Sequence, residues 1–184
     1  MVSLQPPLCD FGWKALDFDL LGVDGVRYNL ANARGENGLL VMFICNHCPY
    51  VKSIRERLVR DTHELQLQGI NSIAIMSNDP AEYEEDSFEN MKQAAINYRY
   101  PFPYVWDETQ QVAKNYGAVC TPDFFGFNAN LELQYRGRLD ASRKEAIQDA
   151  PRDLFEAMLQ VARTGMGPRE QIASMGCSIK WKNE

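Results

Sequence analysis

The spacing of apolar positions changes several times along the chain, and each spacing predicts a different element. Residues 39–44 are continuously apolar and residues 70–76 are nearly so, as in strands whose two faces are both buried. Between them, apolar side chains recur every three or four residues from 51 to 65, which is the spacing of one helix face. A strand, a helix and a second strand in this order predict a right-handed βαβ unit with parallel strands.

The flanking segments predict elements of both kinds. An apolar–polar pattern on either side of the turn at Gly22–Gly25 predicts an N-terminal β-hairpin over residues 16–30. The other predicted elements are a polar loop at 32–38, helices at 83–98, 108–116 and 151–164, and strands at 104–106, 123–127 and 131–135. We therefore expect an α/β fold with a central mixed β-sheet flanked by helices. This domain would span residues 1–164, and a C-terminal tail over 165–184, punctuated by Gly and Pro, would extend from it.

Composition narrows the class of protein. A chain of 184 residues suits one domain with extensions, and a charged fraction of 24% is ordinary for a soluble globular protein. The net charge of −6 disfavours nucleic acid and anionic membranes, so we expect neither as a partner. The longest apolar run, residues 38–45, is far shorter than the ~20 residues that span a bilayer. Residues 1–10 lack the basic start and the apolar stretch of a signal peptide, so we expect a cytoplasmic protein.

Two cysteines stand where the apolar run meets the predicted helix, in the segment Cys45-Asn46-His47-Cys48-Pro49. Cysteines with this spacing at a strand-to-helix turn are typical of a dithiol–disulfide redox site. A sulfur at a helix N-terminus faces unpaired backbone N–H groups and the positive end of the helix dipole, which favour the thiolate. Pro49 suits the first helical turn, because its missing N–H would have no partner there. The segment predicts a thiol-redox enzyme, for which we expect no cofactor.

A metal site is the alternative for the same residues. A structural zinc site usually needs a second pair of ligands at similar spacing. The chain has no second pair of cysteines at this spacing and only two histidines, so the redox interpretation is favoured. A site formed by Cys45, Cys48 and Cys120, with or without His47, stays open. The protein would then be a non-catalytic metal-binding or chaperone-like protein.

Three segments carry a family resemblance. They are Phe43–Val51 at the strand-to-helix turn, Val119–Phe125 with its Thr121-Pro122 step, and Met175–Lys182 near the end of the chain. Together they resemble the thioredoxin superfamily, and within it the thioredoxin-like proteins of the alkyl hydroperoxide reductase / thiol-specific antioxidant (peroxiredoxin-like) family. The resemblance covers nearly the whole chain and implies a thioredoxin-like fold with an antioxidant or thiol-redox activity.

The resemblance implies a role for each matching residue. Cys45 would be the exposed attacking thiol of a thiol–disulfide oxidoreductase, and Cys48 the buried resolving thiol. Pro122 would follow a cis peptide bond, and Thr121 would offer backbone hydrogen bonds to a substrate. His47 would tune the site, since a nearby imidazolium stabilises the Cys45 thiolate and raises the reduction potential. The implied partners are a protein or small-molecule disulfide and a thiol electron donor.

A peroxidase acting on hydroperoxides is the alternative within the same family. In that alignment Cys48-Pro49 matches the peroxidatic cysteine and its proline. Cys48 would be oxidised to sulfenic acid, and Cys45, Cys120 or Cys177 would resolve it. Cys45 then stands where those enzymes have a threonine that helps to position peroxide. An arginine that supports peroxide cleavage is also expected in such an enzyme, and Arg136 and Arg138 are the only nearby candidates. The interpretation as a dithiol enzyme is therefore favoured over the peroxidase.

Three further features complete the expectations. Cys120, next to the Thr121-Pro122 step, is either a small buried side chain or a third thiol of the site. Cys177 lies in a tail that can reach the site when extended, at ~3.3 Å per residue, so a resolving role stays open, but simple burial or surface exposure is favoured. The acidic run at residues 82–86 is expected to be a solvated helix start.

Overall fold

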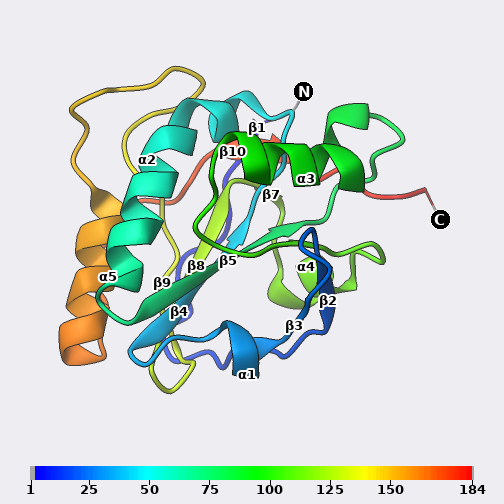
Figure 1. Ribbon diagram of the computed structural model, residues 1–184. Helices are drawn as coiled ribbons and strands as arrows, with labels where there is room; N and C mark the ends of the chain where they lie inside the picture. Colours follow the sequence, from blue (N-terminus) through cyan, green and yellow to red (C-terminus); the bar gives the residue numbers. More distant parts are fainter. Residues whose placement is uncertain (1–2, 184) are drawn as a thin grey trace.

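The computed structural model describes residues 3–183, and within them a mixed sheet runs through the centre of the molecule (Figure 1). Its strand order is β3-β2-β6-β5-β4-β8-β9. Adjacent parallel strands form its middle, namely β4 (Gly38–Phe43), β5 (Ile70–Met76) and β6 (Tyr104–Trp106). Antiparallel strands extend it on both sides: β2 (Leu20–Gly22) and β3 (Arg27–Tyr28) beyond β6, and β8 (Asp123–Asn128) and β9 (Leu133–Tyr135) beyond β4.

Helices cover both faces of this sheet, which explains the continuous apolar runs of its central strands. One face carries α2 (Pro49–Gln66), α3 (Phe88–Asn97) and α5 (Asp153–Thr164), and the other carries α1 (Leu30–Ala33) and α4 (Gln111–Tyr116) (Figure 1). Alternate side chains of β4 belong to the two apolar clusters: Met42 packs with the first set of helices and Phe43 with the second. Because α2 connects β4 to β5, the cysteine pair lies at the carboxyl end of a central strand.

A second sheet joins segments that are far apart in the chain. Its order is β1 (Ser3–Leu4), β10 (Gly176–Ser178) and β7 (Cys120–Thr121), and both pairings are antiparallel. In this register Cys177 lies opposite Ser3 on one side and Thr121 on the other. The Thr121–Pro122 peptide bond is cis, as the resemblance implied. The C-terminal tail therefore pairs with the segment next to the predicted site.

The predicted fold class is confirmed, and β5 and β6 have their predicted bounds. The N-terminal hairpin is present with shorter paired strands, β2 and β3. A helix, α1, begins at the end of the predicted hairpin and extends into the predicted polar loop, because Asn29 and Asn32 exchange side-chain-to-backbone hydrogen bonds that cap it. The helix predicted over 83–98 is divided, because extended Ser87 ends the 3-10 turn η1 (Glu84–Asp86) and caps α3. Among residues 3–183, no helix is long and apolar enough to cross a membrane.

Candidate active site

The cysteine pair lies on the loop between β4 and α2, at the point where the helix begins. Cys48 is the N-cap residue of α2 with an extended backbone (φ −68°, ψ 124°), and Pro49 is the first helical residue, as predicted. Proline cannot donate to a β-ladder, but its fixed φ suits a first helical turn, which places the boundary here. The backbone N–H of Val51, in the first turn of the helix, donates to the carbonyl oxygen of Cys48 at 3.1 Å, and it also acts to lower the pKa of the Cys48 thiol.

Hydrogen bonds to the Cys48 sulfur hold the pKa of this thiol far below its usual range. The side chains of Cys177 and Cys45 have the largest effects, and the backbone N–H groups of Val51 and Cys177 add to them. Burial opposes these donors but does not outweigh them. The lowered pKa favours the thiolate form of Cys48, which makes this sulfur the strongest candidate for a nucleophile in the loop.

The pKa of the Cys45 thiol is shifted in the opposite direction. Burial, the hydrogen bond to Cys48 and the negative charge of Asp86 raise the pKa of the Cys45 thiol well above its usual range. The hydroxyl of Thr121 lies 3.2 Å from Cys45 Sγ and opposes this rise with a smaller effect. Cys45 is thus a protonated thiol beside a thiolate.

Two expectations about Cys45 are corrected. The expectation that Cys45 is exposed is wrong, because Cys45 and Cys48 both have an exposed fraction of 0%. The expectation that His47 stabilises a thiolate on Cys45 is also wrong, because the pKa of Cys45 is raised. The order of roles, with Cys45 attacking and Cys48 resolving, stays a prediction, and the distribution of charge favours the reverse order.

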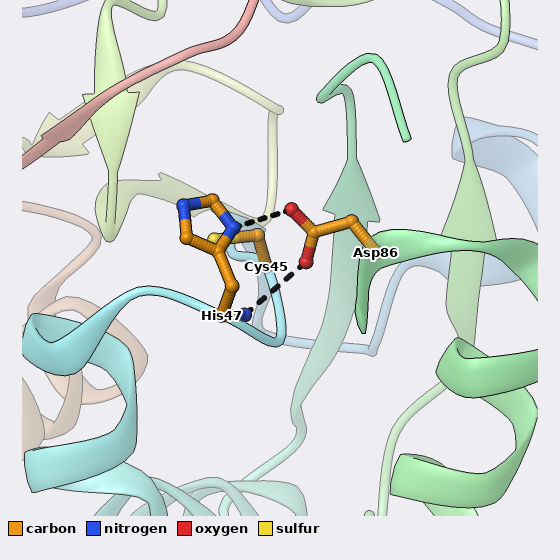
Figure 2. Close-up of side chains that lie close together, drawn as sticks. All are labelled: Cys45, His47 and Asp86. Carbon is orange, nitrogen blue, oxygen red and sulfur yellow. Dashed lines mark hydrogen bonds and ion pairs between the residues drawn. The ribbon is translucent and has the colours of Figure 1, made fainter. Parts of the chain in front are cut away.

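His47 is held by Asp86, as Figure 2 shows. Its Nδ1 lies 2.5 Å from Oδ2 of Asp86, its backbone N–H donates to Oδ1 at 3.2 Å, and its ring stacks on Tyr83 with 3.8 Å between centroids. When Nδ1–H donates to the carboxylate, the lone pair of Nε2 is left as an acceptor. Nε2 is buried and has no hydrogen-bond partner among the described residues. The arrangement presents a fixed imidazole with one unused proton acceptor.

The expectation of a solvated acidic run is wrong for Asp86, which is fully buried. Its Oδ1 accepts the backbone N–H of Asn46 at 2.7 Å, and its Oδ2 accepts from the amide of Asn78 at 2.9 Å, besides the contacts with His47. Burial acts to raise the pKa of Asp86, but these hydrogen bonds outweigh burial and lower it below its usual value. Nothing in the sequence distinguishes Asp86 from its acidic neighbours, because its partners lie far away along the chain.

Cys177, from the C-terminal tail, reaches the same centre. Its Sγ lies 2.8 Å from Cys48 Sγ, and its side chain is buried. The hydrogen bond to Cys48, followed by burial, raises the pKa of Cys177 above its usual range. Cys177 is buried, and it contacts Cys48, as the open alternative of a resolving role requires. The sequence signals were the reach of the tail and the matched segment 175–182, and neither specified which sulfur Cys177 would contact.

Thr121 touches both cysteines of the loop, as its predicted place beside the site requires. Its hydroxyl lies near Cys45, and its carbonyl oxygen lies 3.2 Å from Cys48 Sγ. The neighbouring Cys120 has a different environment: its Sγ lies 3.8 Å from the carbonyl oxygen of Pro122, and burial raises its pKa. These contacts favour the interpretation of Cys120 as a small buried side chain.

The arginines named for the peroxidase alternative are paired elsewhere. Arg136 forms an ion pair with the buried carboxylate of Asp123 at 2.9 Å, and Arg138 forms one with Asp153 at 2.7 Å. Neither appears among the groups that act on the pKa of Cys48. Neither of these two arginines is therefore placed to support peroxide cleavage at Cys48.

Arg55 of α2 is a buried cation near the loop that no sequence motif indicated. It is 8% exposed, its guanidinium lies 3.9 Å from the ring centroid of Tyr98, and its Nη2 donates to the carbonyl of Asn46 at 3.4 Å. In the described part of the chain no carboxylate forms an ion pair with it, and its Nε has no partner. It lines a cavity of about 270 Å³ together with Asn46, Lys52, Glu85 and Tyr98, and Lys52 pairs with Glu85 at 2.9 Å. A buried cation without a counter-ion is costly, so the guanidinium of Arg55 suits an anionic group.

Three side chains near the loop have the chemistry of metal ligands. Cys45, His47 and Asp86 each offer one ligand atom, and these atoms lie within 4.8 Å of one another. This group shares Cys45 and His47 with the set expected from the sequence, but it contains Asp86 in place of Cys48 and Cys120. Sulfur, imidazole and carboxylate donors together suit a borderline metal such as Zn²⁺.

Comparisons with known proteins agree with this geometry. A protein-family model described as the AhpC/TSA family matches residues 11–139. The crystal structure of an uncharacterized conserved protein from Geobacillus kaustophilus is 42% identical, with 100% of this chain and 98% of that chain covered and a TM-score of 0.93. The crystal structure of a hypothetical protein from Sinorhizobium meliloti is 37% identical, with 98% and 99% covered and a TM-score of 0.92.

A more distant match shows the fold. The thioredoxin domain of a thiol-disulfide oxidoreductase from Bacteroides vulgatus is 15% identical, with 72% of this chain and 89% of that chain covered and a TM-score of 0.58. The expected thioredoxin-like fold is confirmed. No curated protein matches the chain.

Proposed function

The chain belongs to the AhpC/TSA family, and from this premise we propose that it is a thiol–disulfide oxidoreductase whose working dithiol is Cys45 and Cys48. The proposal is supported by the position of the pair: Cys48 is the N-cap residue of α2, and Thr121 contacts the sulfurs of both Cys45 and Cys48. The lowered pKa of Cys48 and the raised pKa of Cys45 agree with a nucleophile beside a thiol. The thiolate is the attacking species in thiol–disulfide exchange. A neighbouring thiol can then release the substrate.

The reaction consists of two exchanges. The Cys48 thiolate attacks one sulfur of a substrate disulfide, a bond forms between Cys48 and that half, and the other half leaves as a thiolate. Cys45 then loses its proton, attacks the Cys48 sulfur and expels the second half, which leaves a Cys45–Cys48 disulfide. The proton passes to the departing thiolate, and a nitrogen of His47 within 4.8 Å of Cys45 Sγ can relay it. A thiol donor reduces the disulfide again.

The peroxidase alternative uses the same thiolate with a different oxidant. It is less favoured, because Cys45 replaces the expected threonine and because Arg136 and Arg138 are engaged in other ion pairs. The site instead offers Arg55, which has no ion-pair partner among residues 3–183 and which donates to the carbonyl of Asn46 of the loop. This charge suits a disulfide that carries carboxylates.

The proposal is tested by following the oxidation of the fully reduced protein by glutathione disulfide and, separately, by hydrogen peroxide. We expect glutathione disulfide to oxidise the protein to a form with an internal disulfide at Cys48. Peroxide should react no faster than with any accessible thiolate. A peroxide rate far above that level, with Cys48 converted first to sulfenic acid, would contradict the proposal and establish the peroxidase.

Metal binding is a second candidate function, favoured by the unpartnered Nε2 of His47 and by the grouping of Cys45, His47 and Asp86. The close contact between His47 and Asp86 already uses two of these three groups, so a metal would have to displace that hydrogen bond. We expect protein purified without chelators to hold well under one zinc per chain, by elemental analysis. A stoichiometric metal that is lost in a His47→Ala variant would establish the second candidate instead.

A further inference from the structure

The C-terminal strand β10 brings a third sulfur against Cys48. Cys177 is the central residue of this strand, in register with Thr121 of β7 on one side and Ser3 of β1 on the other. Its Sγ lies 2.8 Å from Cys48 Sγ, and a disulfide has a bond length of about 2.05 Å. The two sulfurs therefore need to approach by less than about 1 Å to form a bond.

Hydrogen bonds on both sides of Cys177 hold the tail in this place. Before it, the hydroxyl of Ser174 donates to the carbonyl of Pro122 at 3.0 Å. After it, the N–H of Ile179 donates to Val119, and Lys180 is bound through its N–H to Asn78 Oδ1 at 2.9 Å. The position of Cys177 is thus built by paired backbone and side chains. It is not the chance contact of a loose tail.

Asn78 connects the tail to the cysteine loop. Its amide nitrogen donates to Asp86, which holds the backbone of Asn46 and His47, while its carbonyl oxygen accepts from Lys180. One buried side chain therefore positions both the loop that carries Cys48 and the strand that carries Cys177. The third sulfur belongs to the same hydrogen-bonded assembly as the proposed dithiol.

The charge on Cys48 controls the reactivity of Cys177. The hydrogen bond to the Cys48 thiolate is the largest cause of the raised pKa of Cys177, whereas the positive charges of Lys180 and Lys144 lower it. Once Cys48 is bonded to a substrate sulfur it carries no charge, and the largest cause of the rise disappears. Cys177 becomes easier to ionise at the step where a resolving thiolate is needed.

We propose that Cys177 is a second resolving cysteine, which attacks the Cys48 sulfur of the mixed disulfide and forms a Cys48–Cys177 disulfide between α2 and β10. The proposal rests on the proposed function, because it needs the mixed disulfide between Cys48 and substrate. In this step the Cys177 thiol loses its proton, and a bond forms between the sulfurs of Cys177 and Cys48. The bond from Cys48 to the substrate half breaks, and that half leaves as a thiolate that takes up the proton. Two protein thiols are oxidised and one substrate disulfide is reduced.

The test uses the full-length Cys45→Ser protein, in which Cys45 cannot resolve the adduct. The reduced protein is treated with glutathione disulfide and analysed by intact mass and by mapping of disulfide-linked peptides. We expect no lasting glutathione adduct and a disulfide that joins Cys48 to Cys177. In Cys45→Ser/Cys177→Ser we expect the adduct on Cys48 to persist at least about 100-fold longer, because no thiol in contact remains. The disulfide mapping uses the Cys45→Ser protein, in which Cys177 is unchanged. Its result therefore holds even if the double variant folds poorly.

The matched control is Cys9→Ser in the Cys45→Ser background. Cys9 lies in the N-terminal segment outside the site, so its removal should leave the lifetime of the adduct unchanged. An adduct that persists as long in Cys45→Ser as in the double variant would overturn the role of Cys177 and leave the proposed function standing. The absence of any adduct on Cys48 in the double variant, with no Cys48–Cys177 disulfide in Cys45→Ser, would overturn both.

Discussion

Replacing Cys48 by serine should lower disulfide reduction to the uncatalysed rate, a loss of at least about 10³-fold. Serine keeps the place at the start of α2, but its hydroxyl stays protonated at neutral pH and is a poor nucleophile without a base. The donors that hold Cys48 as a thiolate, from Cys177, Cys45 and the first turn of the helix, would then have no anion to stabilise. The measurement is the initial rate of glutathione disulfide reduction, with detection of any adduct on the protein.

The Cys45→Ser protein is the matched comparison, and it separates the two possible orders of attack. We expect it to keep the first step, formation of an adduct on Cys48, within about tenfold of the wild-type rate, because Cys48 retains most of its donors. If Cys48→Ser still formed an adduct on Cys45 at the wild-type rate, Cys45 would be the attacking thiol and the proposed order would be wrong.

The pH dependence of the wild-type rate gives a second check of the same prediction. The pKa of Cys48 is lowered, so its thiolate fraction should stay constant as the pH falls from 8 to 6. A thiol with an ordinary pKa of about 8.5 would lose most of its thiolate over this range, and the rate would fall by nearly 100-fold. A nearly flat profile is therefore expected.

Replacing Asp86 by asparagine should lower the free energy of unfolding at pH 7 by about 3 kcal/mol. The carboxylate of Asp86 is fully buried and accepts from Asn46, His47 and Asn78. Asparagine has the same shape, but its amide nitrogen is a donor and would face donors on either side. The variant should also misplace His47 and the loop that carries the cysteines. Urea unfolding measures the first effect, and the rate of disulfide reduction measures the second.

The loss should depend on pH in a direction set by the pKa of Asp86. That pKa is lower in the folded protein than in the unfolded chain, so the carboxylate adds stability above the unfolded value of about 4. This stability is lost as the pH falls through the unfolded value toward the folded one. The difference between wild type and Asp86→Asn should therefore shrink from about pH 5 downward. A difference that stays constant down to pH 3.5 would contradict the assignment.

Glu84→Gln is the matched control for Asp86→Asn. Glu84 lies on the same 3-10 turn and undergoes the same change of charge, but its side chain is exposed. An exposed substitution of this kind should change stability by no more than about 0.5 kcal/mol. An equal loss in both variants would show that net charge, rather than the buried contacts of Asp86, is responsible.

Local patterns in the sequence predicted the frame of the molecule. The apolar runs at 39–44 and 70–76 identified the central strands, because a strand covered on both faces has no polar alternation. The cysteine spacing and Pro49 placed a thiol at the start of α2, because a helix start has local rules. The Thr121-Pro122 step was found by resemblance, and its cis bond is confirmed. Each of these depends on residues that are close together along the chain.

Only the tertiary structure decided which sulfur carries the charge. The ionisation of a thiol depends on the donors, the charges and the burial that surround it in space. For this loop, those groups are Asp86, which lies 39 positions from His47, and Cys177, which lies 129 positions from Cys48. No local spacing encodes either contact. The sequence determined that two cysteines stand at the start of a helix, and the folded chain determined the surroundings that lower the pKa of Cys48, because only folding brings its distant partners within hydrogen-bonding distance.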